Sequence, residues 1–439
     1  MVDTLRRSRL PEDSTPEGEP GNGHLARELL TKGKSLPDQD KGRHYNVLKI
    51  APTSFFADYG CHVRILEETL ALQKMGARAT ICTYGSGRDI EGLDIRRAFS
   101  APLSNGVRVG SSKRKVYFDA WLSFRSLTTS LRIRPNVIHA HLHEGALIGY
   151  PLSKLTRTPL VFDFQGSLTC EMIDHAFLRR DSLAYAPLRQ LEMIINRTAR
   201  AIITSSRNAA DILVREFGCR PSKVFPVPDC VNGDRFRPKW KVPAKERMRM
   251  KRRLGIPENR KVVAYLGLLA EYQGSSYLLQ AANLIRRRTP DVHFLLMGYP
   301  GEKRYQNLAA SLGISDCVTF TGRVPYEKAP IYLSVGDVAV SPKISETEGN
   351  GKLLNYMATG LPTVTFNTPV SKEILGDLGV YAELGNTEDL ASSIEWLLKD
   401  DKAAEQIGRD LRAKVEDSYL WDSAVGRILD IYNIVQGRG

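Results

Sequence analysis

Short apolar runs alternate with helical segments along most of the 439-residue chain. In the first half these runs are Asn46–Ala51, Ala79–Thr83, Val137–Ala140, Leu160–Phe164 and Ala201–Thr204. The alternation starts again after about residue 228, with runs at Val262–Leu266, His293–Met297, Val318–Thr321, Val338–Ser341 and Pro362–Phe366. Strands that alternate with helices predict a parallel sheet covered by helices on both faces. The sequence therefore predicts an α/β protein with two doubly wound domains.

The composition is that of a globular protein, with 42% hydrophobic and 25% charged residues. No run of 18 or more apolar residues predicts a membrane-spanning helix, and the N-terminus lacks the apolar core of a signal peptide. The six cysteines form no CxxC pair, which favours reduced thiols and argues against structural zinc. We therefore expect a cytoplasmic protein.

The net charge of +13 indicates an anionic partner: nucleic acid, a membrane surface or a phosphorylated ligand. Zinc-finger spacing and aromatic RNA-binding strings are absent, so we expect no nucleic acid. The segment Lys113–Arg125 combines a basic start with Val116, Trp121 and Phe124 near one side of a helix. Such a helix could lie on an anionic membrane surface or pack on its own sheet. A second basic run, Lys239–Arg253, would add to the attraction.

The segment Ser345–Val364 contains a Gly-rich turn followed by a helical stretch, Lys352–Thr359, which Gly360 ends. The start of a helix presents unpaired N–H groups and a positive dipole end, which suits phosphate. Glu348 and Asn355 are polar groups that could hold sugar hydroxyls beside it. From this pattern alone, an ordinary helix with a Gly-rich start is an equally good interpretation.

This segment resembles the donor-binding signature of the retaining glycosyltransferases of family 4, which have the GT-B fold. The positions that match are Met357, Ala358, Gly360, Pro362 and Val364, with Lys352 and Tyr356 of a sister form of the signature. The second glutamate of the family falls on Asn355, and Thr347 stands eight residues before it. The resemblance covers about residues 45–436. It implies two Rossmann-like domains facing a central cleft, with the sugar nucleotide held by the second.

The pattern and the resemblance together predict four parts of the chain. Residues 1–43 are rich in Pro, Gly and charged residues, which predicts a disordered N-terminal tail. We expect an acceptor domain at 44–230 and a nucleotide-sugar domain at 231–415. Residues 416–439 should form the C-terminal helix that, in the family, crosses back to the first domain.

The family usually carries an arginine and a lysine in the loop after the first strand of the second domain. Here Leu268 and Gln273 stand at those positions, so both cations are missing. Lys343 and Lys352 could neutralise the donor diphosphate instead, or they could be solvated surface lysines. The expected donor-binding residues are Gly267, Lys343, Glu348, Gly349, Gly351, Lys352 and Asn355.

The acceptor side is expected in two segments of the first half. The loop that precedes the helix at Cys61–Met75 sits where the family has its acceptor-facing loop, although ordinary loop decoration is an equal alternative. The motif HAHLHEG follows a strand at the carboxyl edge, where open α/β sheets bind ligands. Three alternating histidines could suggest a metal, but Gly145 breaks the strand and we expect none. The expected acceptor-binding residues are Asp58, Tyr59, Gly60, Arg64, His143 and Glu144.

The expected catalytic residues are Gln165, Asp163 and Glu171. Many family members have a histidine where Gln165 stands, close to the anomeric carbon of the sugar. Glutamine cannot act as a base, but it can fix a sugar hydroxyl. Asp163 could equally be a buried structural acid.

The resulting hypothesis is an enzyme that moves a hexosyl residue from a nucleotide-diphosphate sugar to a hydroxyl of a lipid-linked or glycan acceptor, with retention of configuration. It would need no cofactor and no metal, and could work at the inner face of the membrane. The altered positions leave an alternative open: a non-catalytic GT-B subunit that binds a sugar nucleotide or scaffolds a partner glycosyltransferase. A sugar-nucleotide epimerase is a weaker third hypothesis.

Overall fold

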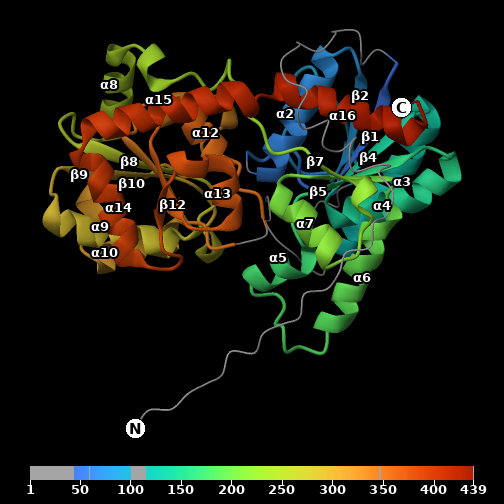
Figure 1. Ribbon diagram of the computed structural model, residues 1–439, viewed down its shortest axis with the longest axis horizontal. Coiled ribbons are helices and arrows are strands. Elements are labelled where there is room, and N and C mark those ends of the chain that lie inside the picture. The colour runs from blue at the N-terminus through green and yellow to red at the C-terminus, as the bar shows by residue number, and fades with distance from the viewer. Residues whose placement is uncertain (1–43, 59, 100–114, 346–347, 439) are drawn as a thin grey trace, which may run out of the picture. The chain divides into compact units, whose positions relative to one another are not determined.

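The computed structural model describes residues 44–58, 60–99, 115–345 and 348–438. The predicted disordered tail, Tyr59, Thr347 and the first two residues of the basic segment Lys113–Arg125 lie outside the described residues. Figure 1 shows the order of the elements. No helix in the described ranges is both long and apolar enough to cross a membrane.

The first domain is built on a sheet of parallel strands in the order β3-β2-β1-β4-β5-β6-β7. These strands are β1 Asn46–Ala51, β2 Arg78–Thr83, β3 Asp94–Arg97, β4 Val137–His141, β5 Leu160–Phe164, β6 Ala201–Thr204 and β7 Val224–Pro226. The chain runs outward in both directions from the β1–β4 pair, where Val47 lies opposite Val137. The carboxyl ends of such a central pair form the usual ligand-binding crevice of an open sheet.

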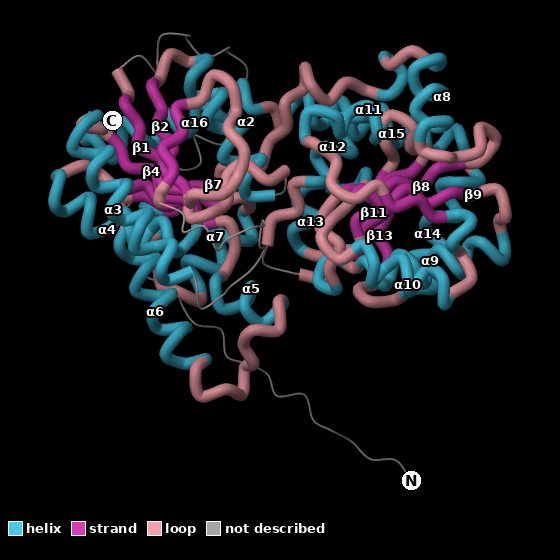
Figure 2. Tube along the Cα trace, turned by 180° about the vertical axis from the view of Figure 1, so that it is seen from behind, coloured by secondary structure: helices cyan, strands magenta, loops and turns pink. Residues whose placement is uncertain are grey.

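Helices cover both faces of this sheet, as Figure 2 shows. They are α2 Gly60–Lys74, α3 Lys115–Ile133, α4 Leu142–Thr156, α5 Leu168–Asp174, α6 Tyr185–Thr198 and α7 Arg207–Arg215. Leu48 and Ile50 of β1 belong to a core shared with α3, α4, α6 and α7, whereas Val47 joins a core with α2. Successive strand residues therefore serve opposite cores, because side chains alternate along a strand.

The second domain repeats the arrangement, with strand order β10-β9-β8-β11-β12-β13. Its strands are β8 Lys261–Leu266, β9 Val292–Met297, β10 Val318–Phe320, β11 Val338–Ser341, β12 Thr363–Phe366 and β13 Val380–Ala382. Its helices are α8 Ala244–Arg253, α9 Ser275–Arg288, α10 Glu302–Ser311, α11 Ala329–Leu333, α12 Lys352–Thr359, α13 Pro369–Leu375, α14 Thr387–Lys399 and α15 Asp401–Ser418. Short 3₁₀ turns lie at η1 Pro221–Lys223, η2 Lys239–Lys241, η3 Glu271–Gln273, η4 Ser315–Cys317, η5 Tyr326–Lys328 and η6 Gly376–Leu378.

The last helix, α16 Trp421–Gln436, returns to the first domain. Val425 and Ile428 are buried in the core that contains Val47, on the same face of the sheet as α2. The hydroxyl of Tyr432 lies 2.7 Å from Nδ1 of the buried His139. The first domain is therefore completed by residues from the far end of the sequence.

Three strands, β3, β7 and β13, were not predicted, and each lies at an edge of its sheet. The strand β3 reads DIRR and is only partly buried, while β7 ends in Pro226. Edge strands are short, carry charges and tolerate proline, so they lack the apolar run that marks a central strand.

Polar contacts join the two domains on either side of a cleft. The carboxylate of Asp58 accepts hydrogen bonds from Nε of Arg323 at 2.8 Å and from the backbone N–H of Tyr326 at 2.9 Å. In a second contact, Oγ of Ser345, in the loop after β11, donates to Asp174 at the end of α5 at 2.6 Å. These contacts place the carboxyl ends of both sheets opposite each other.

Candidate functional site

A cavity of about 370 Å³ lies in the cleft between the domains. Its walls are the loops that follow β1 and β5 in the first domain and β8 and β11 in the second. Its charged and amide side chains are Asp58, Arg64, Lys115, Gln165, Glu171, Asp229, Gln273, Lys343, Glu348, Asn350, Lys352 and Asn355. Loops at the carboxyl ends of two facing sheets are where ligands of such folds bind.

Lys343 shapes the Gly-rich turn before α12. Its Nζ donates to Glu348 Oε2 at 2.7 Å and to the backbone oxygen of Gly349 at 2.8 Å. Only 5% of the side chain is exposed. It is therefore a fixed part of the cavity wall and not a solvated surface lysine.

Lys352 reaches from the start of α12 into the loop after β8. Its Nζ donates to Gln273 Oε1 at 2.6 Å and lies 4.6 Å from the centre of the Tyr265 ring. Gly267 has a φ of +153°, which side chains rarely adopt, and a Cβ there would lie 2.7 Å from this ammonium group, so glycine leaves room for the lysine. Burial, and then the positive charge of Lys343, hold the pKa of Lys352 well below its usual value. The ammonium group thus contacts the position, Gln273, where the family has its lysine.

The other expected donor-binding residues, Glu348, Gly349, Gly351 and Asn355, all line the cavity. A Cβ on Gly349 would lie 3.0 Å from Asp229 Oδ2, and one on Gly351 would lie 3.3 Å from it. The two glycines therefore allow the first domain to approach the start of α12 closely.

Gln165 lines the cavity, and its Nε2 donates to Asp163 Oδ2 at 2.8 Å. Asp163 itself is fully buried below it and does not line the cavity. Its carboxylate accepts hydrogen bonds from Arg64 Nε at 3.1 Å and Nη2 at 2.9 Å, and lies 2.8 Å from His141 Nδ1. Burial favours the protonated acid, but Arg64 and His141 outweigh it and hold the pKa of Asp163 well below its usual value. We therefore correct the expected catalytic role of Asp163 to a structural one.

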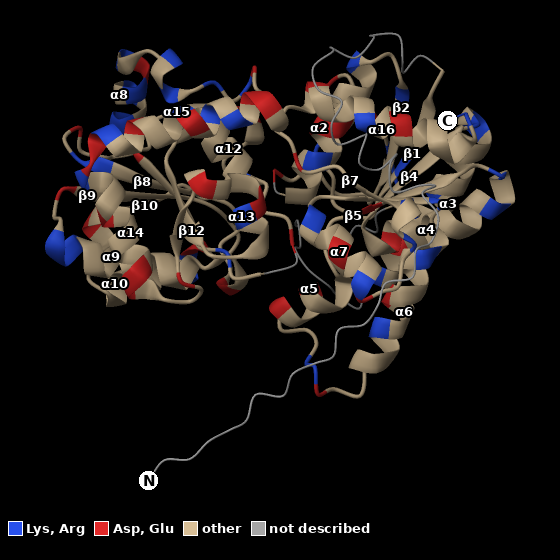
Figure 3. Cartoon of the chain, in the orientation of Figure 1, with Lys and Arg blue, Asp and Glu red and all other residues tan. Residues whose placement is uncertain are grey.

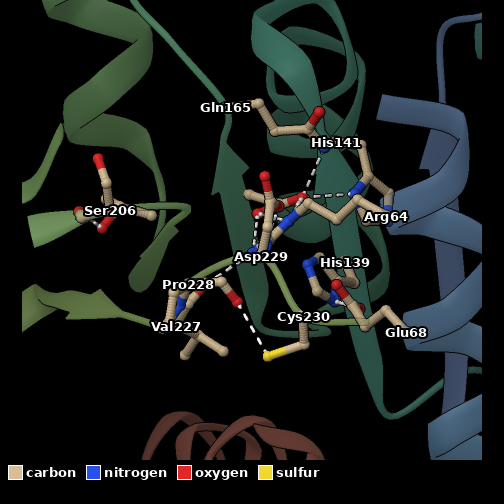
Figure 4. Close-up of polar contacts among 12 residues, drawn as sticks. Arg64, Glu68, His139, His141, Gln165, Ser206, Val227, Pro228, Asp229 and Cys230 are labelled. Carbon is tan, nitrogen blue, oxygen red and sulfur yellow. Dashed lines mark hydrogen bonds and ion pairs between the residues drawn. The ribbon is translucent and has the colours of Figure 1, made fainter. Parts of the chain in front are cut away.

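Arg64 is also held rather than free to bind an acceptor. Besides Asp163, its guanidinium donates to Asp229 Oδ1 at 2.8 Å and to the backbone oxygen of Val227 at 3.2 Å. Figure 4 shows Arg64 between Gln165 and His141 on one side and Asp229 on the other. The buried Arg64–Asp163 pair thus positions two side chains, Gln165 and Asp229, that do face the cavity.

A second buried cluster lies beside this pair. Lys49 Nζ donates to Glu68 at 2.7 Å, and His139 Nδ1 lies 3.2 Å from the same carboxylate. Glu68, His139, His141 and Asp163 bring possible metal-ligand atoms within 4.8 Å of one another. Lys49 and Arg64 already neutralise the two carboxylates, so a metal ion there would meet two fixed positive charges.

Glu171 lines the cavity on α5, opposite Glu348 of the second domain. Burial, then the negative charges of Glu348 and Glu144, raise the pKa of Glu171 to about 8. The carboxyl group therefore keeps its proton at neutral pH while the cleft is empty. His175, one helical turn further on, lies 3.8 Å from Glu348, and its ring contacts that of Tyr272 in a tilted arrangement with 4.3 Å between the ring centres.

The expected acceptor residues have different locations. Asp58 lines the cavity, but its carboxylate is bound by Arg88, Arg323 and the Tyr326 backbone, so it joins the domains instead. Gly60 lines the cavity at the start of α2, with open space where a Cβ would lie. Tyr59 cannot be placed, because it lies outside the described residues.

His143 and Glu144 do not line the cavity, because the chain turns into α4 directly after β4. His143 is buried, with its ring 5.3 Å from Phe162 and 5.4 Å from Phe164. Glu144 forms an ion pair with Lys115, which does reach the cavity. The expected contact of these two residues with the substrates is thus corrected to packing and to the positioning of Lys115.

Sequence reasoning missed His175, Asp229, Tyr272 and Trp421, all of which line the cavity. His175 follows Glu171 by four residues, a spacing that places both on one helical face and could have identified it. Asp229 comes from the connection between the domains and Trp421 from α16. No local pattern marks those two, because only the tertiary structure brings them to the cleft.

We predict that Asp163→Asn lowers the free energy of unfolding by about 3–5 kcal/mol at pH 7, because Arg64 loses its buried partner. Since the folded-state pKa of Asp163 is lowered, its contribution is present above the ordinary aspartate pKa of about 4 and is lost as the pH falls below it. Urea unfolding should show a large difference in the free energy of unfolding between wild type and Asp163→Asn at pH 7, and a smaller difference below pH 4. The control is Asp181→Asn, whose surface pair with Arg179 should contribute less than about 1 kcal/mol. Equal unfolding midpoints for wild type and Asp163→Asn at pH 7 would contradict the assignment.

Comparisons with known proteins identify the family of the chain. The family model described as "Glycosyl transferases group 1" matches residues 246–414, and the one described as "Glycosyl transferase 4-like domain" matches residues 59–230. The chain is 25% identical over 401 residues to a 2-deoxystreptamine glucosyltransferase of Streptomyces kanamyceticus, covering 86% of this chain and 99% of that protein. It is 26% identical over 312 residues to a D-inositol 3-phosphate glycosyltransferase of Corynebacterium aurimucosum, covering 68% of this chain and 71% of that protein.

Solved structures show the same fold. Sucrose-phosphate synthase from Thermosynechococcus elongatus superposes with a TM-score of 0.76 at 17% identity, over 90% of this chain and 99% of that one. Anabaena HepE, in complex with UDP and glucose, superposes with a TM-score of 0.71 at 16% identity, over 88% of this chain and 99% of that one. The fold prediction, two Rossmann-like domains of the GT-B class facing a cleft, is confirmed. The chain is a divergent member of glycosyltransferase family 4, and it is a glycosyltransferase.

Proposed function

We propose that this protein transfers a hexosyl residue from a nucleotide-diphosphate sugar to a hydroxyl group of an acceptor, with retention of configuration. The observation that carries the proposal is the position of Lys352, whose side chain lines the cleft and donates a hydrogen bond to Gln273. A buried lysine with a lowered pKa is costly unless an anion binds beside it. A diphosphate is such an anion.

The donor would bind to the second domain. Its phosphates would lie between Lys343, Lys352 and the N-terminus of α12, where backbone N–H groups and the helix dipole add positive potential. Asn355 faces the same cavity and would bond a ribose hydroxyl. Glu348 would hold a hydroxyl of the sugar. Because a related fold has been solved with UDP and glucose, UDP-glucose is the first donor to test.

The transfer would take place against the first-domain wall. The bond between the anomeric carbon and the phosphate oxygen breaks, and a bond to the acceptor oxygen forms on the same face of the sugar. The departing phosphate takes the proton of the acceptor hydroxyl, so no protein base is required. Gln165, whose side-chain amide is held by Asp163, would orient a hydroxyl group of the sugar. The protonated carboxyl group of Glu171 would donate a hydrogen bond to the bound substrates and keep its proton. Two lysines and a helix dipole carry the phosphate charge, and we propose that no metal ion or cofactor is required.

The acceptor would enter beside Gly60, Lys115 and Gln165 of the first domain. We propose that its hydroxyl belongs to a sugar or cyclitol ring, either lipid-linked or in a glycan. The relatives named for 2-deoxystreptamine and D-inositol 3-phosphate support a cyclitol as the ring type. A non-catalytic subunit is not favoured, because the matching family models and the similar curated proteins are all glycosyltransferases.

We also propose that α3 touches an anionic membrane surface. The helix turns Leu122 into the sheet core but leaves Val116 75% exposed and Phe124 59% exposed. The basic residues Arg125 and Arg132 lie on the same helix. The second basic run forms η2 and α8 of the other domain, where Figure 3 shows its cations; none of the α8 residues is buried.

The function is tested by incubating the protein with UDP-, GDP- and ADP-sugars and myo-inositol or 2-deoxystreptamine, with and without EDTA. We expect release of nucleoside diphosphate from one donor, undiminished by EDTA, and a product whose anomeric configuration by NMR equals that of the donor. An inverted product would refute retention, and sensitivity to EDTA would refute metal independence. No release from any donor, together with no thermal shift from any nucleotide, would refute the proposed reaction.

We predict that Lys352→Met weakens UDP binding by about 10–100-fold but leaves uridine binding unchanged, because only the diphosphate meets the lost ammonium group. The pKa of Lys352 is lowered in the free protein and should rise beside the phosphates. Wild type should therefore take up a proton on binding UDP, and its affinity should fall as the pH rises through the lowered pKa. Calorimetry in buffers of different ionisation enthalpy measures this uptake.

The matched control for this experiment is Lys372→Met, which removes an exposed lysine on α13 of the same domain. It should bind UDP as wild type does. If Lys352→Met keeps both the wild-type affinity and the proton uptake, the diphosphate does not bind at Lys352.

We predict that the double variant Val116→Ser, Phe124→Ser loses binding to vesicles of phosphatidylglycerol, measured by flotation. Replacing two exposed apolar side chains removes their insertion into the interface. Trp396→Ser, an exposed aromatic on α14 of the other domain, is the control and should float as wild type does. Equal binding of all three proteins, or equal binding to neutral vesicles, would refute this contact.

A further inference from the structure

Most of the positive charge in the cavity is already balanced by carboxylates. The described arginine and lysine side chains of the cavity wall that form ion pairs are Arg64 with Asp163 and Asp229, Lys115 with Glu144, and Lys343 with Glu348. Lys352 lines the same cavity and contacts no carboxylate among the described residues. A diphosphate carries more negative charge than one ammonium group can balance, so we expect neutral N–H groups to supply further hydrogen bonds.

Gln273 is the polar side chain that Lys352 contacts most closely. Lys352 Nζ donates to Oε1 of Gln273 at 2.6 Å. An ammonium group has no acceptor, so a charged Lys352 requires the amide to turn its oxygen toward the lysine. The amide nitrogen Nε2 then points away from Lys352 with two N–H groups to donate. The residue is only 7% exposed and lines the cavity, and its other polar neighbour is the hydroxyl of Tyr272, a further cavity residue.

The loop that carries Gln273 is held firmly against the loop that carries Lys343. The backbone N–H of Ile344 donates to the backbone oxygen of Tyr272 at 3.0 Å. Gly274 has a φ of +78°, and a Cβ there would lie 1.8 Å from the backbone oxygen of Pro342. The close approach of the two loops thus requires glycine at 274, and it fixes the amide of Gln273 beside the start of α12.

We propose that Gln273 and Lys352 together bind the donor diphosphate, with Nε2 of Gln273 donating hydrogen bonds directly to phosphate oxygens beside the ammonium group. Glutamine suits this position because it accepts from the ammonium group and donates to the phosphate. A second lysine at 273 would instead place two ammonium groups in contact in a cleft of low polarity, where they repel each other. This inference rests on the proposed function, since it assigns a further residue to the donor side of the same cleft.

A purely positioning role, in which Gln273 only holds Lys352 in place, makes a different prediction. If Gln273 acts only through Lys352, its replacement has no further effect once Lys352 is gone. If Gln273 contacts the diphosphate itself, its replacement still weakens binding in a protein that lacks Lys352. A double-mutant cycle therefore separates the two roles.

The test measures binding of UDP and of uridine by calorimetry to the full chain, to Gln273→Met, to Lys352→Met and to the double variant. Methionine has nearly the length of glutamine but no N–H group. We expect Gln273→Met to weaken UDP binding about tenfold on its own and at least about threefold in the Lys352→Met background, with uridine binding unchanged throughout. No effect of Gln273→Met on UDP in the Lys352→Met background overturns the direct contact.

The variant Gln273→Glu tests the polarity of the amide. Its carboxylate still accepts the hydrogen bond from Lys352, but it has no N–H group and meets the phosphates with a negative charge. UDP binding should therefore fall by about 100-fold or more, while uridine binds as before. The matched control is Gln280→Met, an exposed glutamine on α9 of the same domain, which should bind UDP as wild type does.

If Gln273→Met no longer binds uridine, and so has lost more than one hydrogen bond, Gln273→Glu decides. Wild-type affinity of Gln273→Glu for UDP overturns the assignment of Gln273 and leaves the proposed function intact. Failure of the wild-type protein to bind UDP overturns both.

Discussion

The buried ion pair between Arg64 and Asp163 is the interaction on which the first-domain side of the cleft depends. It joins α2 to β5, and through Val227 and Asp229 it reaches the segment that leads into the second domain. Either charge would be strongly destabilising if it were buried here without its partner, so each group holds the other in position. The pair holds Gln165 and Asp229 where they line the cavity, and the ring of Trp421 on α16 lies 5.9 Å from the guanidinium. Helix α16, which crosses back to the first domain, therefore contacts the same ion pair through Trp421.

On the opposite wall, the proposed phosphate site has its positive charge in the expected place in space although the charge comes from a different place in the chain. The family positions for an arginine and a lysine hold Leu268 and Gln273, and a motif comparison counts two losses. In the structure Lys352 donates to Gln273, and the adjacent Gly267 provides the room for its ammonium group. The divergent sequence thus keeps a cation on the loop that should meet the diphosphate.

The central strands could be predicted from the sequence because they are buried on both faces. β1, β5, β6 and β11 have the predicted bounds, and α12 agrees with the predicted helix Lys352–Thr359. The edge strands β3, β7 and β13 could not, since a strand such as Asp94–Arg97 is only partly buried and carries no apolar run. In the site, the expected donor residues Lys343, Glu348, Gly349, Gly351, Lys352 and Asn355 line the cavity, but His143 does not. At the β4–α4 junction Leu142 lines the cavity, whereas the next residue, His143, is buried in the core.

The sequence by itself determined the two α/β domains, the family and the donor-side turn, because hydrophobic periodicity and a glycine-rich helix start are local properties. Only the tertiary structure decided the rest of the site. It buries Asp163 under Arg64, commits Asp58 to the domain contact, and brings Asp229, Trp421 and His175 to the cleft from three separate segments. It also sets Glu171 of one domain against Glu348 of the other. These roles follow from burial and from charges that are distant in the chain and close in space, and no spacing along the sequence records such distances.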